Sequence, residues 1–316
     1  MVELSPQEKG RVAFVVNPAS ANGSTGRRWP EIAHRSAEAG LVGEALLSER
    51  PGQIAELVER AAADGAGLVV AVGGDGTVNE AVNGLMRLRG RGAEAPELAV
   101  LPRGTGTDFV RTFRIPTRLD RAIEIARGGR TREIDAGRVE FRAWDGTETV
   151  SYFANVASAG MSGAVAQRAN TTSKALGGKA SFLAATLAVF SRWKPSRVEV
   201  AIDEERRAGL MYDVIVANCV YLGGGMKMTP DAIPDDGLFD VLLIGDITRT
   251  DLALTLPKVY RGTHLPHPKA ELLRGRTVSV DAETPLPIEL DGEQPGTTPA
   301  RFEIVPRALR LRVPPA

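Results

Sequence analysis

Two uninterrupted apolar runs near the start of the chain constrain the fold more than any other feature. Val12–Val16 ends at Asn-Pro, and Gly67–Val72 ends at Gly-Gly. Runs without polar interruption are typical of strands buried on both faces of a parallel sheet. Apolar residues recur at helical spacing between the runs, over 54–62, and again after the second run, over 78–86. The first third therefore predicts a βαβαβ pattern and a doubly wound α/β layer.

From about Gly137 the pattern changes to short apolar segments separated by Gly, Pro and Asp, which predicts an antiparallel β domain. Two Ala- and Leu-containing stretches, Lys179–Phe190 and Leu252–Tyr260, are expected to be helices that interrupt it. The remaining expected elements are a strand over 98–101 and a helix over 119–126 in the first part, and strands over 139–143, 150–156, 198–202, 214–216, 239–244 and 278–280 in the second.

Composition excludes several classes of protein. The 316 residues are 43% hydrophobic and 25% charged, which is globular composition for two domains. The 39 basic and 39 acidic residues cancel, and no basic run exceeds two residues, so no nucleic-acid partner is expected. The single cysteine, Cys219, cannot form an internal disulfide, which favours the cytoplasm. Apolar runs such as Phe182–Phe190 are shorter than the ~20 residues of a membrane span, so we expect a soluble or peripheral protein.

Three glycine-containing loops follow predicted strands. The segment GGDGTVNE occupies 73–80, and companion loops occupy 17–26 and 102–109. Glycines let backbone N–H groups approach an anion, and a helix N-terminus attracts phosphate. A tight turn with Thr77 as the helix N-cap is the alternative for the first loop. Because ligands of open parallel sheets bind beyond the carboxyl ends of the strands, three such loops together predict a nucleotide site.

Two late carboxylates, Asp291 and Glu293, flank a glycine after the apolar segment 288–290. Phosphoryl transfer needs a carboxylate that takes the proton of the acceptor hydroxyl, and this pair fits that role and an electrostatic partner. On the residues alone, an ordinary Asp-Gly hairpin turn is the favoured interpretation of this pair. The chain lacks the GxxxxGK[ST], HExxH, CxxC, GxSxG and GxGxxG patterns. The usual signatures of P-loop, zinc, α/β-hydrolase and Rossmann dinucleotide sites are therefore absent from the sequence.

Several other residues have ordinary interpretations. Cys219 is expected to be a small core residue, and the three histidines, His34, His264 and His267, lack metal-ligand spacing. Arg103, inside the third loop, is equally compatible with a phosphate contact and with a solvated loop position.

The motifs together are similar to those of one known family. They are GGDGTVNE, the NPxS loop at 17–20, PRGTGTDF at 102–109, three glycines at 223–225 with Pro230, DDG at 235–237, and LDGE at 290–293. GGDGT alone also occurs in NAD kinases and phosphofructokinases. Continued by Asn-Glu and joined to a late DGE, it resembles the diacylglycerol kinase catalytic family, which includes bacterial lipid kinases and sphingosine and ceramide kinases. The resemblance covers residues 11–313.

This resemblance implies a Rossmann-like α/β nucleotide-binding domain of the NAD kinase and diacylglycerol kinase type over 1–136, completed by the returning segment 306–316. It also implies an antiparallel β-sandwich domain for the lipid substrate over 137–305. The implied activity is ATP-dependent phosphorylation of a lipid hydroxyl, with the nucleotide bound between the domains and with Mg²⁺. The expected acceptor is a diacylglycerol-like or sphingoid-like lipid at a membrane surface.

The resemblance also carries over individual residues. Asp75 joins Asp291 and Glu293 as an expected catalytic residue, and which of the last two is the base stays open. A magnesium site is implied at the Asp236 side chain, with the backbone carbonyls of Ile233 and Leu238. Nucleotide contacts are implied for Asn17, Pro18, Ser20, Ser48, Gly74, Asp75, Gly76, Thr77, Asn79, Glu80 and Thr105.

Two departures from the family pattern leave alternatives open. Thr107 stands where the family usually has Asn, and Ala21 stands where Gly is usual. A hydroxyl cannot reproduce the two-sided hydrogen bonding of an amide, so nucleotide geometry or preference could differ. The alternatives are a kinase for a soluble acceptor such as NAD or a sugar, and a lipid- or nucleotide-binding regulator with little catalysis. The expected location is the cytoplasm or the inner membrane face, with a homodimer left open.

Overall fold

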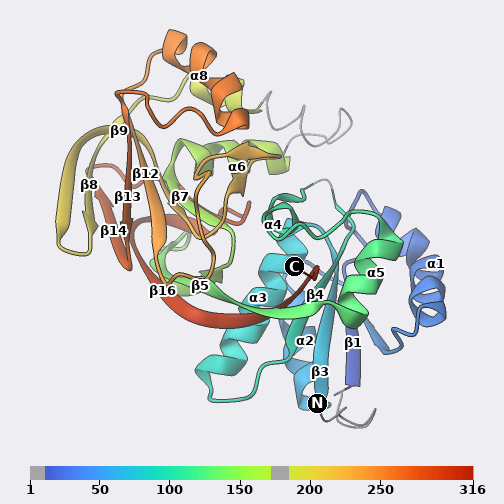
Figure 1. The fold of residues 1–316 in the computed structure, drawn as a ribbon. Helices are drawn as coiled ribbons and strands as arrows, with labels where there is room; N and C mark the ends of the chain where they lie inside the picture. The colour runs from blue at the N-terminus through green and yellow to red at the C-terminus, as the bar shows by residue number, and fades with distance from the viewer. Residues whose placement is uncertain (1–10, 105, 172–184, 316) are drawn as a thin grey trace. The chain divides into compact units, whose positions relative to one another are not determined.

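The computed structural model describes residues 11–104, 106–171 and 185–315, without the side chains of 169–171. The chain divides into two compact units (Figure 1). Unit 1 comprises Met1–Ile134 and Arg307–Ala316, and unit 2 comprises Asp135–Pro306. These divisions fall within two residues of the domain boundaries predicted from the sequence.

Unit 1 is built on a parallel sheet in the order β4-β3-β1-β2. The last strand of the chain, β16, extends this order, because Leu311 pairs with Leu98 of β4 in parallel. The elements of unit 1 are β1 (Arg11–Val16), α1 (Ser24–Glu38), β2 (Glu44–Leu47), α2 (Ile54–Ala63), β3 (Ala66–Gly73), α3 (Asp75–Gly90), β4 (Glu97–Pro102), α4 (Asp108–Thr112) and α5 (Leu119–Gly128), with the first part of β5 (Arg130–Ala143) and the last part of β16 (Gly296–Val313).

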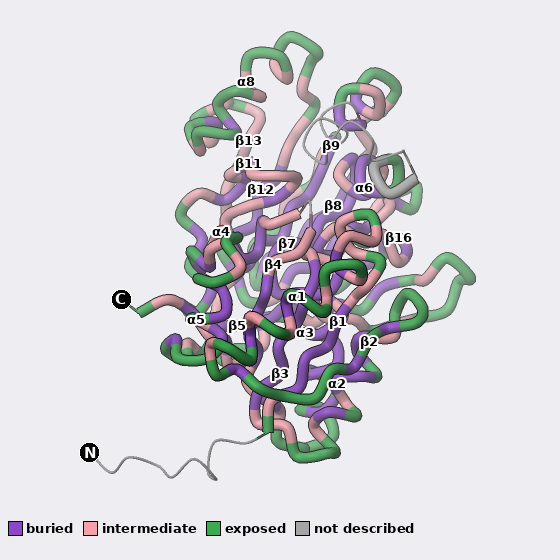
Figure 2. Tube along the Cα trace, turned by 90° about the vertical axis from the view of Figure 1, so that its right-hand side faces the viewer, coloured by how far each residue is buried: buried purple, intermediate pink, exposed green. Residues whose placement is uncertain are grey.

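The apolar runs of the sequence become the buried centre of this sheet. Residues 13–16 of β1 and 68–73 of β3 are buried, with helices on both faces of the sheet (Figures 1 and 2). Ile32 of α1 and Ile123 of α5 pack with β1, β3 and β4 side chains in one core cluster. After β1 the chain crosses to β2 on one side and returns to β3 on the other, so β1 and β3 border the switch point where α/β folds bind ligands.

Unit 2 is an antiparallel β-sandwich in which β9 joins two groups of strands. The first half of β9 pairs with β8, and its second half lies between β7 and β12. The elements of unit 2 are the second part of β5, β6 (Glu148–Phe153), β7 (Val156–Gly160), α6 (Met161–Thr171), β8 (Ser196–Ile202), β9 (Glu205–Ala217), β10 (Tyr221–Leu222), β11 (Met226–Lys227), β12 (Phe239–Gly245), α8 (Arg249–Arg261), β13 (Ala270–Gly275), β14 (Thr277–Ala282), β15 (Ile288–Leu290) and the first part of β16.

The alternation of side chains along β9 separates the two cores of unit 2. Val214 and Val216 point into the sandwich core with Phe153 and Phe302. Ile215 and Ala217 face the other way, into a cluster with Val259 of α8 and with β11 and β12 side chains. Asp213 therefore lies on the face of the sheet that α6 and α8 cover.

Most predicted elements are confirmed, with one correction. The segment 150–156 is not one strand: β6 ends at Phe153, and β7 begins at Val156, because Ala154 and Asn155 turn away to bind another segment. The predicted helix 179–190 lies partly outside the described residues, of which 185–190 are helical. The helix predicted over 252–260 is α8. Among the described residues, no helix is both long and apolar enough to cross a bilayer.

Candidate functional site

The loops that follow β1, β3 and β4 lie against one another in unit 1. A Cβ added to Gly104 would lie 2.5 Å from the Cα of Gly74, so the close approach of these two loops leaves no room for a side chain at Gly104. The N–H of Arg103 donates to the carbonyl of Gly73 at 2.6 Å, and that of Asn17 donates to Val72 at 3.1 Å. The sheet thus brings the three glycine-containing loops together, as the sequence predicts.

Thr77 links α3 to the loop after β1 and does not cap the helix. Its Oγ1 accepts a hydrogen bond from Asn17 Nδ2 at 3.1 Å, and a Cβ on Gly73 would lie 2.1 Å from that oxygen. The N-cap of α3 is Gly74, and no side chain caps it. The predicted alternative of Thr77 as an N-cap is therefore wrong. Backbone N–H groups at the start of α3, with the helix dipole, make an environment suited to an anion.

Asp75, in the first turn of α3, links this helix to the third loop. Its Oδ2 accepts the N–H of Asp108 at 3.1 Å, and a Cβ on Gly106 would lie 2.5 Å from the same oxygen. Thr107, the departure from the family pattern, accepts from Arg111 Nη2 at 3.3 Å through its hydroxyl. The threonine is thus engaged with α4 by its side chain.

The other candidate nucleotide residues of unit 1 hold the loops in place. Glu80 accepts the N–H groups of Gly52 and Ile54 at 3.3 and 3.0 Å, which fixes the start of α2. Ser20 Oγ donates to the Asn17 carbonyl at 2.9 Å. Ser48 is buried and donates its backbone N–H to Val16 at 2.9 Å. Pro18 lies in the loop after β1, Gly76 and Asn79 lie in α3, and Thr105 lies outside the described residues.

An unpartnered side-chain nitrogen of Arg103 supports phosphate binding by these loops. Arg103 Nε is buried and has no hydrogen-bond partner among the described residues. Burial, followed by the charge of Arg28, lowers the pKa of Arg103 from its usual value. An anion would supply the missing acceptor. The residues of unit 1 therefore fit a nucleotide phosphate.

Asp291 and Glu293 form a tight turn in unit 2, which we call the carboxylate turn (Leu290–Glu293). Backbone hydrogen bonds of 2.8 and 2.9 Å join Leu290 and Glu293. Asp291 and Gly292 have φ angles of +50° and +94°, as the two central residues of a type I′ turn require. The hairpin-turn alternative is thus correct for the backbone.

The Asp291 carboxylate is anchored by the backbone of the segment between β6 and β7. Oδ2 accepts the N–H of Ala154 at 3.0 Å, and Oδ1 accepts those of Asn155 and Val156 at 3.0 Å each. Hydrogen bonds from N–H groups favour the ionised form of a carboxyl group. Asp291 is buried, whereas Glu293 is exposed. The turn therefore presents one fixed carboxylate and one exposed carboxylate.

Two buried acids beside the carboxylate turn were not predicted from the sequence. Glu289 and Asp213 are only 1% and 2% exposed, on β15 and β9. Burial raises the pKa of Glu289 to about 8 and that of Asp213 to about 7. A glutamate between Ile288 and Leu290 reads as the solvent face of a strand. Only the helices that cover the sheet reveal that this face is buried.

The predicted metal residues lie in the loop before β12. Asp236 accepts the N–H of Leu238 at 3.1 Å and is bound by Arg274 Nη2, while Ile233 is 49% exposed. Carboxylate and carbonyl oxygens are the donors that Mg²⁺ prefers, so the donor type fits. However, Arg274 already neutralises part of this charge. Among the described residues, no group of three His, Cys, Asp or Glu side chains is arranged to hold a metal ion.

An apolar cavity of about 100 Å³ lies in unit 2 under α6 and α8. Its walls include Leu222, Leu242 and Val259, with Ser162 and Asp213 as polar groups on one side. Ser162 donates to Asp213 Oδ2 through both its N–H, at 2.9 Å, and its hydroxyl. The histidines near this cavity have ordinary roles: buried His264 Nε2 lies 3.1 Å from the Met228 carbonyl, and His267 lies 3.6 Å from Asp251.

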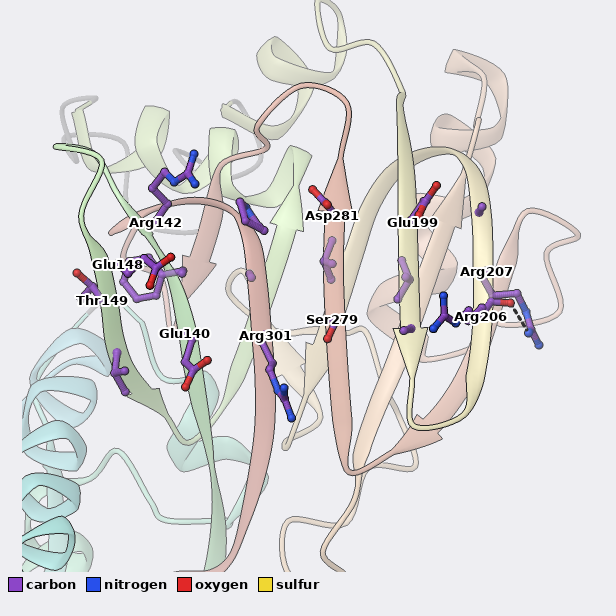
Figure 3. A pocket seen from close by; sticks show the side chains of 18 residues that line it. Glu140, Arg142, Glu148, Thr149, Glu199, Arg206, Arg207, Ser279, Asp281 and Arg301 are labelled. Carbon is purple, nitrogen blue, oxygen red and sulfur yellow. Dashed lines mark hydrogen bonds between the residues drawn. The ribbon is translucent and has the colours of Figure 1, made fainter.

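A larger hollow of unit 2 lies on the sheet face formed by β5, β6, β8, β9, β14 and β16 (Figure 3). Its labelled side chains come from these strands and carry charges of both signs, as on a solvated sheet face. The acidic residues are Glu140, Glu148, Glu199 and Asp281, and the basic ones are Arg142, Arg206, Arg207 and Arg301. Four charges of each sign favour no particular ligand.

Two family models cover nearly the whole chain. Residues 11–139 match the diacylglycerol kinase catalytic domain. Residues 155–313 match the YegS C-terminal NAD kinase beta sandwich-like domain. A curated diacylglycerol kinase of Staphylococcus saprophyticus is 26% identical over 292 residues, which is 92% of each chain.

Solved structures have the same fold. The crystal structure of a Bacillus anthracis protein assigned as a diacylglycerol kinase matches with a TM-score of 0.79 and 23% identity, over 100% of this chain and 99% of that one. Yeast NADH kinase in complex with NADH matches with a TM-score of 0.51 and 11% identity, over 98% of this chain and 85% of that one. The fold is thus the one shared by diacylglycerol and NAD kinases. Given the family matches and the motifs they contain, the chain belongs to the diacylglycerol kinase catalytic-domain family, a family of lipid kinases.

Proposed function

We propose that the chain uses ATP and Mg²⁺ to phosphorylate a hydroxyl group of a diacylglycerol-like or sphingoid-like lipid at a membrane surface. The observation that carries the proposal is the contact between the Gly74 and Gly104 backbones at the start of α3. Loops this close, with uncapped helix N–H groups and the unpartnered Arg103 Nε beside them, favour a bound phosphate. The motif around Gly74 is also the one that the family match includes.

The carboxylate turn is proposed to receive the proton of the acceptor hydroxyl. Its two carboxylates, Asp291 and Glu293, differ in constraint: three N–H groups hold the first, and the second is exposed. A carboxylate held in the ionised state can accept a proton as the oxygen attacks phosphorus. The Asp236 loop is the proposed position of Mg²⁺, which would neutralise charge on the transferred phosphate.

Two observations favour a lipid acceptor over a soluble one. The cavity under α6 and α8 is lined mainly by apolar side chains, which suits a hydrocarbon chain. The curated relative from Staphylococcus saprophyticus is a diacylglycerol kinase. The likeness to yeast NADH kinase concerns the fold alone, at 11% identity, and so supplies no equal argument for a dinucleotide acceptor.

Transfer of labelled phosphate from ATP is the direct test. The purified chain is incubated with Mg²⁺ and a total lipid extract, and separately with NAD and sugars, and the labelled product is identified. We expect label in a lipid, with Asp291→Asn or Glu293→Gln lowering kcat by about 10²- to 10⁴-fold in at least one case. Glu199→Gln, an exposed strand glutamate of unit 2, is the matched control and should be unaffected.

Three outcomes would contradict parts of the proposal. Unchanged kcat in both Asp291→Asn and Glu293→Gln would exclude the carboxylate turn as the proton acceptor. Label only in NAD or a sugar would assign a soluble acceptor. A rise in melting temperature with ATP, without transfer to any acceptor, would instead indicate a nucleotide-binding regulator.

A further inference from the structure

The buried side chain of Glu289 forms a hydrogen bond with the backbone of the carboxylate turn. Its Oε1 accepts the N–H of Gly292, the central residue of the turn. The Leu290–Glu293 hydrogen bonds do not use that N–H, so Glu289 supplies its partner. Gly292 separates Asp291 from Glu293, and a change at its peptide group would redirect both carboxylates.

The strand register explains why a glutamate occupies this position. On β15, Ile288 and Leu290 point into the sandwich core, so Glu289 points to the opposite face. β15 pairs with β7, which places Glu289 opposite Ser158, and the Ser158 hydroxyl donates to Glu289 Oε2 at 3.1 Å. Both carboxyl oxygens of Glu289 are therefore hydrogen-bonded inside the protein.

The groups around Glu289 favour its neutral form. Asp213, across β7 on β9, and Asp291, on the turn itself, both contribute negative charge, and no cation forms an ion pair with Glu289 among the described residues. α6 packs on β15, and Arg168, the charged residue within its described side chains, is exposed. Burial first, and then Asp291 and Asp213, raise the pKa of Glu289 to about 8, against the lowering effects of Gly292 and Ser158.

We infer that Glu289 is a positioning residue of the proposed phosphoryl transfer: as a neutral acid clamped between Ser158 and Gly292, it fixes the direction in which the turn presents Asp291 and Glu293. The inference rests on the proposed function. Ionisation of Glu289 would place a second buried charge two residues from the Asp291 carboxylate and repel it. The cost of burying an unpaired charge makes that state unfavourable and links the geometry of the turn to pH.

The test compares Glu289→Gln and Glu289→Ala with the parent and with Glu199→Gln as control. Gln keeps an acceptor oxygen for the Gly292 N–H and cannot ionise, whereas Ala removes the clamp. The parent kcat should fall as the pH rises through about 8. Glu289→Gln should keep the neutral-pH kcat and lose that fall. Glu289→Ala should lower kcat by roughly 10- to 100-fold, with little change in KM for ATP, because misplaced groups slow the reaction.

A second measurement does not depend on catalysis. Hydrogen exchange of the peptide containing Gly292 should accelerate in Glu289→Ala and stay near the parent rate in Glu289→Gln. If no acceptor is phosphorylated, the proposed function fails, but the hydrogen-exchange measurement still tests whether Glu289 holds the Gly292 N–H.

Two results would overturn the inference. One is a pH profile of Glu289→Gln that coincides with that of the parent. The other is parent-like exchange at Gly292 in Glu289→Ala. If Glu289→Ala does not fold, the profile of Glu289→Gln still decides the matter.

Discussion

Gly104 occupies a position where any side chain would collide with another loop. An added Cβ would lie 2.5 Å from Gly74 Cα and 3.0 Å from Gly74 N. Both of these are backbone atoms, which cannot rotate away as a side chain can. The glycine is therefore needed for the contact between two loops and not for an unusual φ angle.

We predict that Gly104→Ala weakens ATP binding and lowers the free energy of unfolding by about 1–3 kcal/mol, because the backbone must shift to admit the methyl group. Calorimetric titration with ATP and chemical denaturation measure the two effects. Gly90→Ala, at the end of α3, is the matched control, since no atom lies within 4 Å of its added Cβ. That change should be neutral or stabilise by up to about 1 kcal/mol. Unchanged ATP affinity in Gly104→Ala would contradict the assignment of these loops to phosphate.

At the scale of elements, the sequence predicts strands and loops better than it predicts what covers them. The apolar runs of β1 and β3 and the loops after them follow from local pattern and from the geometry of parallel strands. Glu289 and Asp213 could not be anticipated, because alternation assigns a residue to a face and does not say which element packs there. The break at 154–155 also escapes, because it depends on Asp291, more than 130 residues away.

Helix α8 shows how an element is delimited by local signals. Thr248 caps it: the Thr248 hydroxyl accepts the N–H of Asp251 at 3.1 Å, and the Asp251 carboxylate accepts the N–H of Thr248 at 2.8 Å. The backbone hydrogen bond from Thr248, followed by the side-chain hydrogen bond from Lys269, keeps the pKa of Asp251 well below its usual value. Gly262, with φ of +73°, ends the helix.

We expect Thr248→Ala to lower the free energy of unfolding by about 1 kcal/mol, because the N–H of Asp251 loses its partner. Thermal and denaturant unfolding measure this change. Thr250→Ala, at an exposed site in the same helix, lacks the cap bond and should change stability by less than about 0.5 kcal/mol. Equal effects of the two substitutions would show that the cap contributes little.

At the scale of the whole molecule, unit 1 is assembled from both ends of the chain. The final part of β16 buries Leu309, Leu311 and Val313 in unit 1. Arg310 Nη2 donates to the Ala95 carbonyl at 2.8 Å, and Arg312 pairs with Glu97. This segment is therefore an integral strand of the α/β sheet and not a tail.

Deletion of Arg307–Ala316 should destabilise unit 1 selectively. Three apolar side chains lose their burial, each contributing about 1.5–3 kcal/mol. Hydrogen exchange should rise in peptides from β3 and β4 and stay near the parent value in β9 and β12. Deletion of residues 315–316 alone is the control and should leave exchange unchanged. Uniform acceleration in both units would indicate that the chain unfolds as one cooperative body.

The same strand has a consequence for biosynthesis. Ribosomes make a protein from its amino terminus, and domains usually fold in that order. Here unit 1 needs Arg307–Ala316, which is translated after all of unit 2, whereas unit 2 is continuous in sequence and has all its strands as soon as Pro306 has emerged. The nascent protein is thus expected to fold its β-sandwich before its α/β domain. A fusion partner attached after β16 would therefore affect the folding of unit 1.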